Sequence, residues 1–308
     1  MKNITAEQIE SLFSYQEFIP FLNNYLSKKI EVPQRNHFDI GNNTLLLMPA
    51  WTEQFCGVKI ATAFPGNRKI NKPTIHAVYT LFDAKTGEPL AQMDGKILTN
   101  KRTAAASALA SQYLSKKESK NLLMVGNGAL CPELIEAHAS VRAIKNVKIW
   151  GRDLSNVKKV IAKNNWGKLN VNISKSLRLD AQWADIVSCA TSAVDPVILG
   201  KNIISGTHID LVGSYKPNMR EADDVLIKKS KIIIDNAAAK KECGDIFIPL
   251  KNKIINESSI KGTLADLANR KINGRESNDE ITLFKSVGFA LEDLAAAEYF
   301  YGKLKIEN

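Results

Sequence analysis

A glycine-rich turn between an apolar segment and a helical pattern is the feature that most constrains the fold of this chain. Leu-Leu-Met-Val-Gly-Asn-Gly occupies residues 122–128, a helical pattern follows, and Val-Lys-Ile-Trp forms a second apolar segment at 147–150. A strand, a turn, a helix and a second strand within about thirty residues are the unit that binds the pyrophosphate of a dinucleotide in a doubly wound sheet. Gly-Asn-Gly alone is typical of an ordinary turn, but its flanking elements favour nucleotide binding.

Each position of this turn has a physical role in that interpretation. Gly126 permits the tight turn, and Gly128 has no side chain to keep a pyrophosphate away from the backbone. The helix that follows offers unpaired N–H groups and the positive end of its dipole. Cys131 stands where a third glycine is usual, and it is small enough for the helix to pack closely against the strand.

The N-terminal part of the chain predicts a mixture of helices and antiparallel strands. Thr5 and Gln8 form a capping box for a first helix, and a second helical pattern carries Phe18, Phe21, Leu22 and Leu26. Thr99 is expected to cap an alanine-rich helix that runs to about Leu114. Strands are expected at about 44–50, 56–63, 74–83 and 89–93, with a hairpin turn at 85–88 before the last of them.

From residue 120 the pattern changes to strands that alternate with helices, which predicts a parallel sheet. Apolar strand cores lie at 121–125, 147–150, 185–190, 208–212 and 231–235. Residues 281–301 are interpreted as a short apolar link and a long amphipathic helix that returns to the first domain. We therefore expect an α/β protein with a Rossmann-type doubly wound parallel sheet, residues 116–284, inserted into an α+β domain made of residues 1–115 and 285–308.

Composition excludes several classes of protein. A hydrophobic content of 44% and a charged content of 24% are typical of a soluble globular protein. No apolar run approaches the roughly 20 residues that cross a bilayer, and the N-terminus has no apolar signal core. The four cysteines are far apart and three lie in apolar stretches, so we expect free thiols, most of them buried, and a cytoplasmic location.

The net charge of +10 does not by itself predict a polyanionic partner. The lysines are scattered in pairs such as Lys116–Lys117 and Lys240–Lys241, and no aromatic residues are interleaved with them. We therefore expect neither a nucleic acid nor a membrane as a partner. The four histidines lack metal-ligand spacing, and no metal site is predicted.

Two basic residues lie where an anionic partner would explain them. Lys59 lies in the apolar strand pattern Cys-Gly-Val-Lys-Ile-Ala, with its neighbours on the opposite face. The period alone favours a solvent-facing lysine over one that an anionic ligand holds in a cleft. Arg102 is expected near the start of a helix, where a cation is mildly unfavourable, so it calls for an anionic partner or a surface position.

Arg152 directly follows the second strand of the glycine-turn unit. NAD-preferring folds usually carry an acidic residue at this strand end, where it accepts hydrogen bonds from the ribose hydroxyls. An arginine there favours a 2′-phosphate, and hence NADPH. A surface ion pair with the neighbouring Asp153 is the alternative interpretation.

Seven motifs occur here in the order in which they occur in one protein family. They are Gly-Val-Lys-Ile at 57–60, Phe-Pro-Gly-Asn at 64–67, Thr-Gly-Glu-Pro-Leu-Ala-Gln-Met-Asp-Gly at 86–95, Leu-Thr-Asn-Lys-Arg-Thr-Ala-Ala at 98–105, Val-Gly-Asn-Gly at 125–128, Met-Arg-Glu-Ala-Asp at 219–223 and Glu-Ile-Thr-Leu-Phe-Lys-Ser-Val-Gly-Phe-Ala-Leu-Glu-Asp at 280–293. Through these motifs nearly the whole chain resembles the ornithine cyclodeaminase/mu-crystallin family. The family's usual Gln-Ala after the glycine turn is Leu130-Cys131 here.

The resemblance implies a homodimer that pairs through the N-terminal, substrate-binding domain. By motif position, Arg35, Lys59 and Arg102 correspond to the residues that hold the substrate carboxylate. Thr74 and Arg102 lie where the family meets its cofactor, and Ser286 and Val287 correspond to residues near the nicotinamide and the substrate. The further expected cofactor contacts are Gly126, Asn127, Gly128, Ala129, Leu130, Arg152, Thr191 and Ser214.

A departure from the family pattern concerns the class of reaction. The cyclodeaminase has an acidic residue and then a proline just after the glycine at a strand end, whereas this chain has Tyr215 in the place of the acid. Cyclodeamination needs an acid–base group there for the ornithine amine, and a phenol is a poor general base at neutral pH. The stretch is more similar to the reductase branch of the family.

The expected activity is therefore the reduction of Δ1-pyrroline-2-carboxylate, and of its six-membered piperideine analogue, to proline and pipecolate. The expected cofactor is NADPH, with NADH as the alternative, and Lys59 is the candidate for managing the proton of the imine nitrogen. Ornithine cyclodeaminase and alanine dehydrogenase are alternatives within the family, and Tyr215 weighs against the first. A non-catalytic NADPH-binding protein similar to mu-crystallin is the third, and Lys59 and Arg102 argue against a purely structural role.

Overall fold

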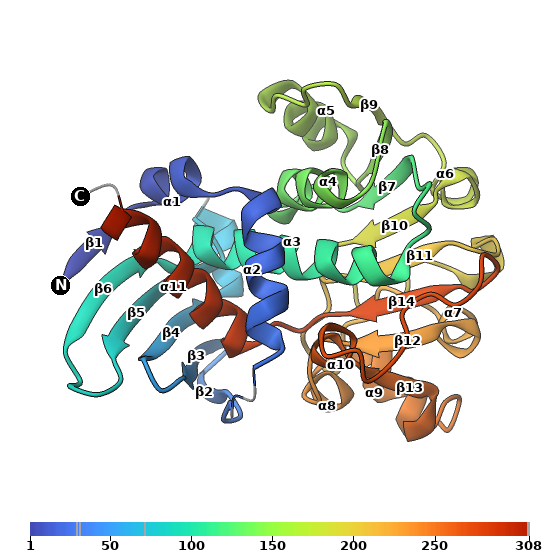
Figure 1. The fold of residues 1–308 in the computed structure, drawn as a ribbon. Helices are drawn as coiled ribbons and strands as arrows, with labels where there is room; N and C mark the ends of the chain where they lie inside the picture. The colour runs from blue at the N-terminus through green and yellow to red at the C-terminus, as the bar shows by residue number, and fades with distance from the viewer. Residues whose placement is uncertain (29, 31, 71, 307–308) are drawn as a thin grey trace. The chain divides into compact units, whose positions relative to one another are not determined.

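The contacts of the chain divide it into two units. A computed structural model describes residues 1–28, 30, 32–70 and 72–306. Residues 1–103 and 289–308 form the first unit, and residues 104–288 form the second. The chain therefore enters the second unit within helix α3 (Gly95–Leu114) and returns to the first unit just before helix α11 (Ala290–Ile306) (Figure 1).

The first unit is built on a six-stranded sheet. Its strands, in spatial order, are β1 (Lys2–Ile4), β6 (Pro89–Asp94), β5 (Ile75–Asp83), β4 (Phe55–Ala63), β3 (Asn43–Trp51) and β2 (Asn36–Ile40). All neighbours are antiparallel except β1 and β6, which are parallel. The predicted hairpin turn between β5 and β6 is confirmed: the Asp83 carboxylate accepts hydrogen bonds from the N–H groups of Lys85 and Thr86, and Gly87 has a φ of +73°.

Three helices belong to this unit, and one of them is more deeply buried than its sequence suggested. Helix α1 (Ala6–Leu12) begins with the predicted Thr5–Gln8 capping box, and α2 (Tyr15–Leu26) follows. Helix α11 packs against α2 and against strands β3, β4 and β5. All eight residues from Ala290 to Ala297 are buried, so the amphipathic pattern expected for this helix is wrong for its first half, because neighbours cover it on every side.

The two faces of the six-stranded sheet have different surroundings. The β3–β5 residues that share a face with Lys59 include Met48, Ala50 and Tyr79, and all of these are buried. The opposite face carries Leu47, Ile60 and Val78, which pair in register across β3, β4 and β5. Ile60 and Val78 are exposed, as are Phe38 and Trp51 on the same face. One face of the sheet is thus apolar and open.

Helix α3 begins earlier than the sequence suggested. The Asp94 carboxylate accepts a hydrogen bond from the N–H of Ile97 and caps the helix at Gly95. The Thr99 hydroxyl instead donates to the carbonyl of Gly95 inside the helix, so the expectation that Thr99 is the cap is wrong. Arg102 therefore lies well inside the helix and away from the positive end of its dipole.

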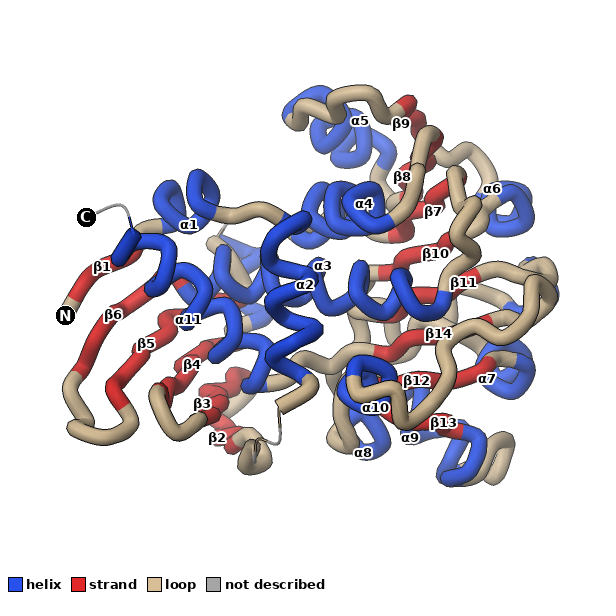
Figure 2. Tube along the Cα trace, viewed as in Figure 1, coloured by secondary structure: helices blue, strands red, loops and turns tan. Residues whose placement is uncertain are grey.

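The second unit contains an eight-stranded sheet in which every pairing is parallel. In spatial order its strands are β13 (Ile260–Thr263), β12 (Lys231–Ile234), β14 (Thr282–Lys285), β11 (His208–Leu211), β10 (Ile186–Cys189), β7 (Asn121–Val125), β8 (Asn146–Trp150) and β9 (Asn170–Ile173). Figure 2 shows these strands running side by side. The predicted parallel sheet is confirmed, but β9, β13 and β14 were missed, and residues 282–285 form a buried strand where only a link was expected.

The strand order reverses in the middle of this sheet. Strands β7, β8 and β9 follow one another in one direction, and β10 then pairs with the other side of β7. This is the topology of a doubly wound fold, in which ligands bind at the carboxyl ends of the two strands that flank the reversal. The helices of this unit are α4 (Leu130–Val141), α5 (Leu154–Lys163), α6 (Leu177–Trp183), α7 (Asp224–Lys229), α8 (Ala239–Glu242), α9 (Gly244–Lys251) and α10 (Leu264–Ala268).

A chain of polar side chains lies inside the apolar core of the second unit. His138 Nδ1 is 2.9 Å from the hydroxyl of Ser111, and its Nε2 is 3.2 Å from Asp210 Oδ2. Ser188 donates to the same carboxylate oxygen. These residues are fully buried, so the network connects α3, α4 and the sheet.

Among the described residues, none of the helices combines the length and apolar character needed to cross a membrane.

Candidate functional site

The glycine turn after β7 has the conformation that its sequence requires. Gly126 has a φ of +112°, and its N–H donates to the carbonyl of Trp150 at the end of β8. A Cβ at this position would lie 2.5 Å from the carbonyl oxygen of Ala190, so the turn closes tightly over the end of β10. Gly126 therefore meets two demands, a left-handed backbone and close backbone contact, that only glycine satisfies.

The next residues leave room for a ligand. A Cβ on Gly128 would have no atom within 4 Å, and Gly128 and Ala129 are exposed. Ala129 occupies the N-cap of α4 without a side-chain acceptor, so the first N–H groups of the helix have no side-chain cap. Cys131 is fully buried. Open space beside a glycine and an uncapped helix N-terminus fit the pyrophosphate of a dinucleotide.

Arg152 is exposed directly after β8. The neighbouring Asp153 caps helix α5, because its carboxylate accepts hydrogen bonds from the N–H of Ser155 at 2.8 Å and from the side chain of Asn156 at 2.9 Å. Within the part of the chain that the structure describes, no ion pair joins Arg152 to Asp153. Asp153 thus acts as a helix cap, and the role of Arg152 stays a prediction.

The other residues predicted for the cofactor in this unit lie in loops at the carboxyl edge of the sheet. Thr191 follows β10, Ser214 follows β11, and Ser286 and Val287 follow β14. Ser214, Ser286 and Val287 are buried, and Thr191 is partly buried. Tyr215 lies in the same loop as Ser214 and is 36% exposed. Parallel strands bring these loops to one edge, which is why residues far apart in sequence become neighbours.

The first unit contains a buried cluster of opposite charges. The Lys59 ammonium lies 2.9 and 2.8 Å from the two carboxylate oxygens of Asp293. Arg102 donates through Nε to Asp293 at 2.8 Å and through Nη1 to Glu292 at 2.7 Å. Only 4% of Lys59 and 3% of Arg102 is exposed. One carboxylate thus binds both cations, and the period-based interpretation of Lys59 as a solvent-facing residue is wrong.

Burial and charge act on these cations in opposite directions. Burial lowers the pKa of Lys59, the Asp293 carboxylate opposes that effect, and Arg102 and Arg35 lower the pKa further, so that it falls to about 8. Burial also disfavours the charge of Arg102, but Asp293 and Glu292 together raise its pKa. Lys59 therefore changes protonation close to neutral pH, whereas Arg102 keeps its charge.

Local structure explains how this cluster forms. Lys59 is on β4, on the face that packs against α11, and Tyr79 is directly opposite it on β5. Glu292 and Asp293 lie in the first turn of α11, where the helix dipole favours negative charge. The Tyr79 hydroxyl is fully buried and has no hydrogen bond among the described residues. A Cβ on Gly57 would lie 2.3 Å from this hydroxyl, so glycine is needed there.

Sequence reasoning missed the carboxylates and the tyrosine of this cluster. The available signal was a pair of consecutive acids, Glu292 and Asp293, in the otherwise apolar first half of this helix. Of the other predicted residues, Arg35 is partly buried and near enough to lower the pKa of Lys59. Thr74 is partly buried just before β5, and its carbonyl accepts a hydrogen bond from Phe64. The structure thus brings Lys59 and Arg102 to one carboxylate and places Arg35 near enough to act on Lys59 through its charge.

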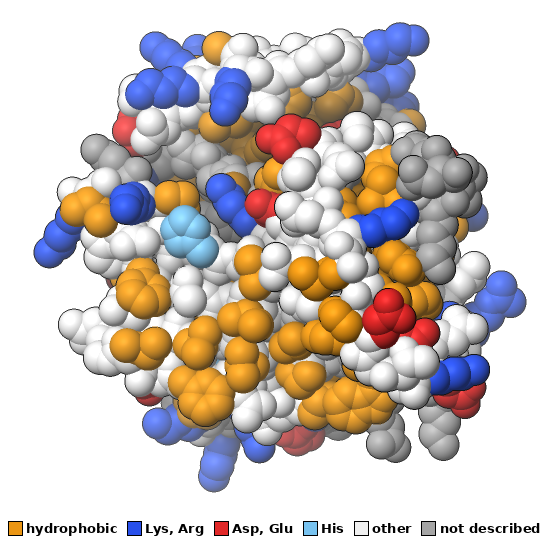
Figure 3. Space-filling model, turned by 90° about the vertical axis from the view of Figure 1, so that its left-hand side faces the viewer, with side chains coloured by type: hydrophobic (Ala, Val, Ile, Leu, Met, Phe, Trp, Pro, Cys, Tyr) orange, Lys and Arg blue, Asp and Glu red, His pale blue; other side chains and the backbone are white. Residues whose placement is uncertain are grey.

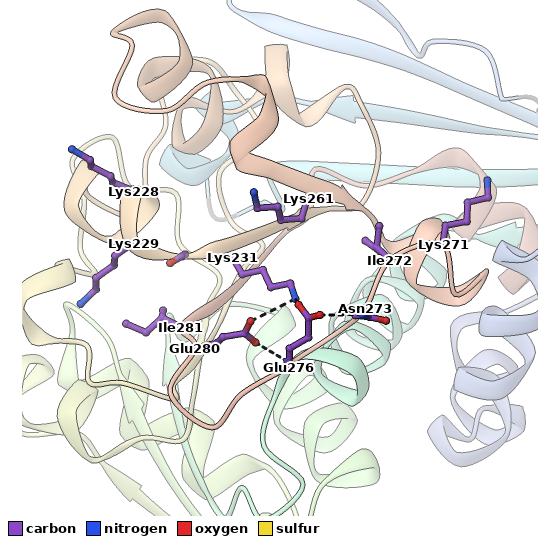
Figure 4. Close-up of a pocket in the computed structure, with 11 residues that line it drawn as sticks. Lys228, Lys229, Lys231, Lys261, Lys271, Ile272, Asn273, Glu276, Glu280 and Ile281 are labelled. Atoms are coloured by element: carbon purple, nitrogen blue, oxygen red, sulfur yellow. Dashed lines mark hydrogen bonds and ion pairs between the residues drawn. The ribbon is translucent and has the colours of Figure 1, made fainter.

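A different pocket lies at the amino edge of the parallel sheet. It has a volume of about 650 Å³ and is lined by lysines, among them Lys228, Lys229, Lys231, Lys261 and Lys271. Figure 4 shows the ammonium of Lys231 beside the carboxylates of Glu276 and Glu280, at distances of 2.5 and 3.6 Å. Because doubly wound folds bind nucleotides at the carboxyl edge, this open pocket is not the dinucleotide site.

The comparisons with known proteins agree with this geometry. A sequence model of the ornithine cyclodeaminase/mu-crystallin family matches residues 5–308, and the chain belongs to this family. A protein of Colwellia psychrerythraea named Delta(1)-pyrroline-2-carboxylate reductase is 38% identical to this chain, over 99% of each sequence.

Two solved structures extend the comparison. The Thermococcus litoralis Delta(1)-pyrroline-2-carboxylate reductase in complex with NADH and L-proline is 34% identical, with a TM-score of 0.96 over 100% of this chain and 98% of that chain. An archaeal alanine dehydrogenase dimer with bound NAD is 28% identical, with a TM-score of 0.94 over 100% and 97% of the two chains. The similarity therefore extends over the whole length of each protein.

Proposed function

We propose that this protein is an NAD(P)H-dependent reductase that converts Δ1-pyrroline-2-carboxylate to proline and acts on its six-membered analogue as well. The observation that carries the proposal is the buried cluster of Lys59, Arg102 and Asp293 in a chain whose full-length relatives include pyrroline-2-carboxylate reductases. Alanine dehydrogenase is the second candidate, because the archaeal enzyme has a similar fold over its whole length.

The second unit supplies the dinucleotide site. The N-terminus of α4 and the space beside Gly128 would hold the pyrophosphate, and the loops that carry Thr191, Ser214 and Ser286 would hold the nicotinamide end. When bound, the reduced nicotinamide supplies a hydride for the imine carbon. The residues of this unit bind and orient the cofactor, which turns the reaction into a positioned, intramolecular-like step.

The first unit supplies the charges for a small anionic substrate. Its cluster contains three cationic side chains, Arg35, Lys59 and Arg102, and two carboxylates, Glu292 and Asp293. The formal excess of one positive charge matches one substrate carboxylate. Charge-assisted hydrogen bonds to so small a ligand also orient it.

Lys59 also suits the proton chemistry of imine reduction. The imine carbon accepts the hydride and the ring nitrogen must carry a proton, because an iminium is the better hydride acceptor. With a pKa of about 8, the Lys59 Nζ holds a proton at neutral pH yet gives it up more readily than an ordinary lysine. Asp293 would stabilise the protonated form and keep the ammonium in place.

The oligomer we propose is a homodimer formed through the open face of the six-stranded sheet. Phe38, Trp51, Ile60 and Val78 share this face and are exposed to between 38 and 47%. Hydrophobic side chains gather over the lower part of the face drawn in Figure 3, where few charged side chains interrupt them. Exposed apolar patches of this kind mark interaction surfaces, and a second copy of the same sheet face is self-complementary.

The buried thiols of Cys131, Cys189 and Cys243 suit the cytoplasm, where we place the protein.

The dimer prediction can be tested with one charged substitution. Val78→Asp places a carboxylate in the centre of the apolar sheet face and should convert a dimer into a monomer, as measured by light scattering during size exclusion. Val225→Asp, on the exposed surface of α7, is the matched control and should leave the dimer intact. A monomeric wild-type protein would refute the proposed dimer.

The test of the proposed function compares imine reduction with ornithine cyclisation. Cyclising ornithine requires oxidation of an amine, ring closure, loss of ammonia and reduction, whereas a preformed imine needs only a hydride and a proton. Because Tyr215 replaces the acid of the cyclodeaminase, we predict rapid NADPH oxidation with Δ1-pyrroline-2-carboxylate and no proline or ammonia from ornithine and NAD.

The same assay separates the alternatives. Faster turnover of pyruvate and ammonia than of the cyclic imine would make the protein an alanine dehydrogenase, and turnover of ornithine at a comparable rate would make it a cyclodeaminase.

Lys59→Ala and Arg102→Ala should each lower kcat/KM for the imine by roughly tenfold or more, through loss of a charge-assisted contact of about 1.5–3 kcal/mol.

The pH dependence should follow Lys59. The protonated form holds the substrate carboxylate and donates the proton, so kcat/KM should fall as the pH rises through about 8. Asp293→Asn removes the charge that favours the ammonium and should move this descending limb to lower pH. Asp180→Asn, which removes the partner of Lys148 in the second unit, is the control and should leave the limb in place. An unshifted limb in Asp293→Asn would show that another group titrates.

Cofactor preference should depend on Arg152. If its guanidinium binds a 2′-phosphate, Arg152→Ala will raise the KM for NADPH by roughly tenfold or more and leave the KM for NADH nearly unchanged. Lys163→Ala removes an exposed cation at the far end of α5 and should change neither value. Equal effects of Arg152→Ala on both cofactors would exclude the 2′-phosphate contact.

A further inference from the structure

Lys285 is a buried cation at the carboxyl edge of the parallel sheet. It is the last residue of β14, which lies between β11 and β12, and its side chain is fully buried. Its Nζ lies 3.5 Å from Asp245 Oδ2 and 3.7 Å from Glu221 Oε2. Among the described residues the ammonium has no hydrogen bond, so its charge depends on these two carboxylates. Burial alone lowers the pKa of Lys285, but Asp245 and Glu221 raise it above its ordinary value.

Glu221 ties together two loops at the carboxyl edge of the sheet. Its Oε1 accepts hydrogen bonds from the N–H of Thr191 at 2.7 Å and from the Thr191 hydroxyl at 3.0 Å. Its Oε2 accepts from the N–H groups of Gly213 at 2.7 Å and Ser214 at 3.2 Å. The two loops also touch directly, because a Cβ on Gly213 would lie 2.0 Å from the Thr191 carbonyl oxygen. One carboxylate therefore fixes the loop after β10 to the loop after β11.

Asp245 and Asp235 extend this arrangement. Asp245 accepts a hydrogen bond from the Ser214 hydroxyl through Oδ2 and from the N–H group of Glu221 at 2.8 Å through Oδ1. Asp235 accepts from the N–H of Val287 at 2.7 Å and from the Ser286 hydroxyl at 3.1 Å. The loop after β14 is thus held in the same manner. Each of Ser214 and Ser286 donates its hydroxyl proton to a carboxylate, which leaves the serine oxygen to act as an acceptor; Ser286 also accepts from the N–H of Gly288 at 3.3 Å.

We infer that Lys285 is a positioning residue for the nicotinamide end of the cofactor site. Its ammonium lies beside both Glu221 and Asp245, whose oxygens accept hydrogen bonds from the loops that carry Thr191 and Ser214. Burial raises the pKa of Glu221, and the positive charge of Lys285 opposes that rise. An ionised carboxylate is an acceptor at every lone pair, whereas a protonated one also carries a donor that no loop N–H can accept. This inference rests on the proposed dinucleotide site. It adds that the buried charge of Lys285 keeps the loops at the nicotinamide end of that site in place.

The experiment compares two ligands that differ at the nicotinamide end. ADP-ribose contains the pyrophosphate expected at the glycine turn but no nicotinamide, whereas NADH contains both. In Lys285→Met, the Kd for NADH measured by calorimetry should rise at least tenfold, while the Kd for ADP-ribose should stay within twofold of the wild-type value. General destabilisation of the fold would raise the Kd of both ligands alike. A rise in the Kd for NADH alone is therefore specific to the positioning of the nicotinamide end.

Lys231→Met is the matched control. Lys231 is the first residue of β12, the strand next to β14, and its ammonium is paired with Glu276 and Glu280 at the amino edge of the sheet (Figure 4). Both variants replace a buried or partly buried lysine with methionine in adjacent strands. Lys285 lies at the carboxyl edge of the sheet, whereas Lys231 lies at its amino edge. The Kd values for NADH and ADP-ribose should both remain within twofold of wild type.

A second variant serves if Lys285→Met does not fold. Glu221→Gln keeps the shape of the side chain, but its amide oxygen can accept from one loop only, and its NH2 group then faces the N–H groups of the other loop. The same split between NADH and ADP-ribose is expected. Equal weakening of both ligands, or of neither, would overturn the role of Lys285, whereas a wild-type protein that binds neither ligand would overturn the dinucleotide site itself.

Discussion

The carboxylate of Asp293 is the interaction on which the candidate substrate site depends. It binds the ammonium of Lys59 and the guanidinium of Arg102 in a region from which water is almost excluded. Removing one partner of a buried ion pair is far more costly than removing an exposed one, because an uncompensated charge remains inside the protein. Helix α11 therefore does more than cover the sheet. The carboxylates in its first turn form ion pairs with Lys59 and Arg102, and these ion pairs allow both cations to be buried.

The second unit uses the same physical device for a different purpose. Lys285 lies between Glu221 and Asp245, and their remaining lone pairs are occupied by loop N–H groups and hydroxyls. In the first unit two cations are bound by buried carboxylates, and we propose that the cluster binds an anionic substrate; in the second unit the carboxylates bind the N–H groups of two loops. In the first cluster the carboxylates lie in the first turn of α11, whereas Lys59 and Arg102 lie inside a strand and a helix; in the second cluster Lys285 is the last residue of β14.

The sequence predicted those parts of the fold whose signal is local. The turn at Gly126 and Gly128, the Thr5–Gln8 capping box and the hairpin at Gly87 were identified because each needs particular residues at fixed spacing. Strand β14 was missed because four residues between a polar loop and a long helix carry no period that separates strand from link. The start of α3 was misplaced because Asp94 and Thr99 are both good caps, and local sequence does not decide between them.

Taken alone, the sequence determined the class of fold, the glycine turn at Gly126 and three candidate cations, Arg35, Lys59 and Arg102. These features depend on the order of motifs and on residue type, and both can be read directly from the sequence. Only the tertiary structure decided what those cations face. Strand period placed Lys59 on one of two faces, but which face is covered depends on where α11 packs, some 230 residues later in the chain. The partners Asp293, Glu221 and Asp245 were likewise found only in three dimensions, because the attraction between charges depends on distance in space and leaves no regular spacing in the sequence.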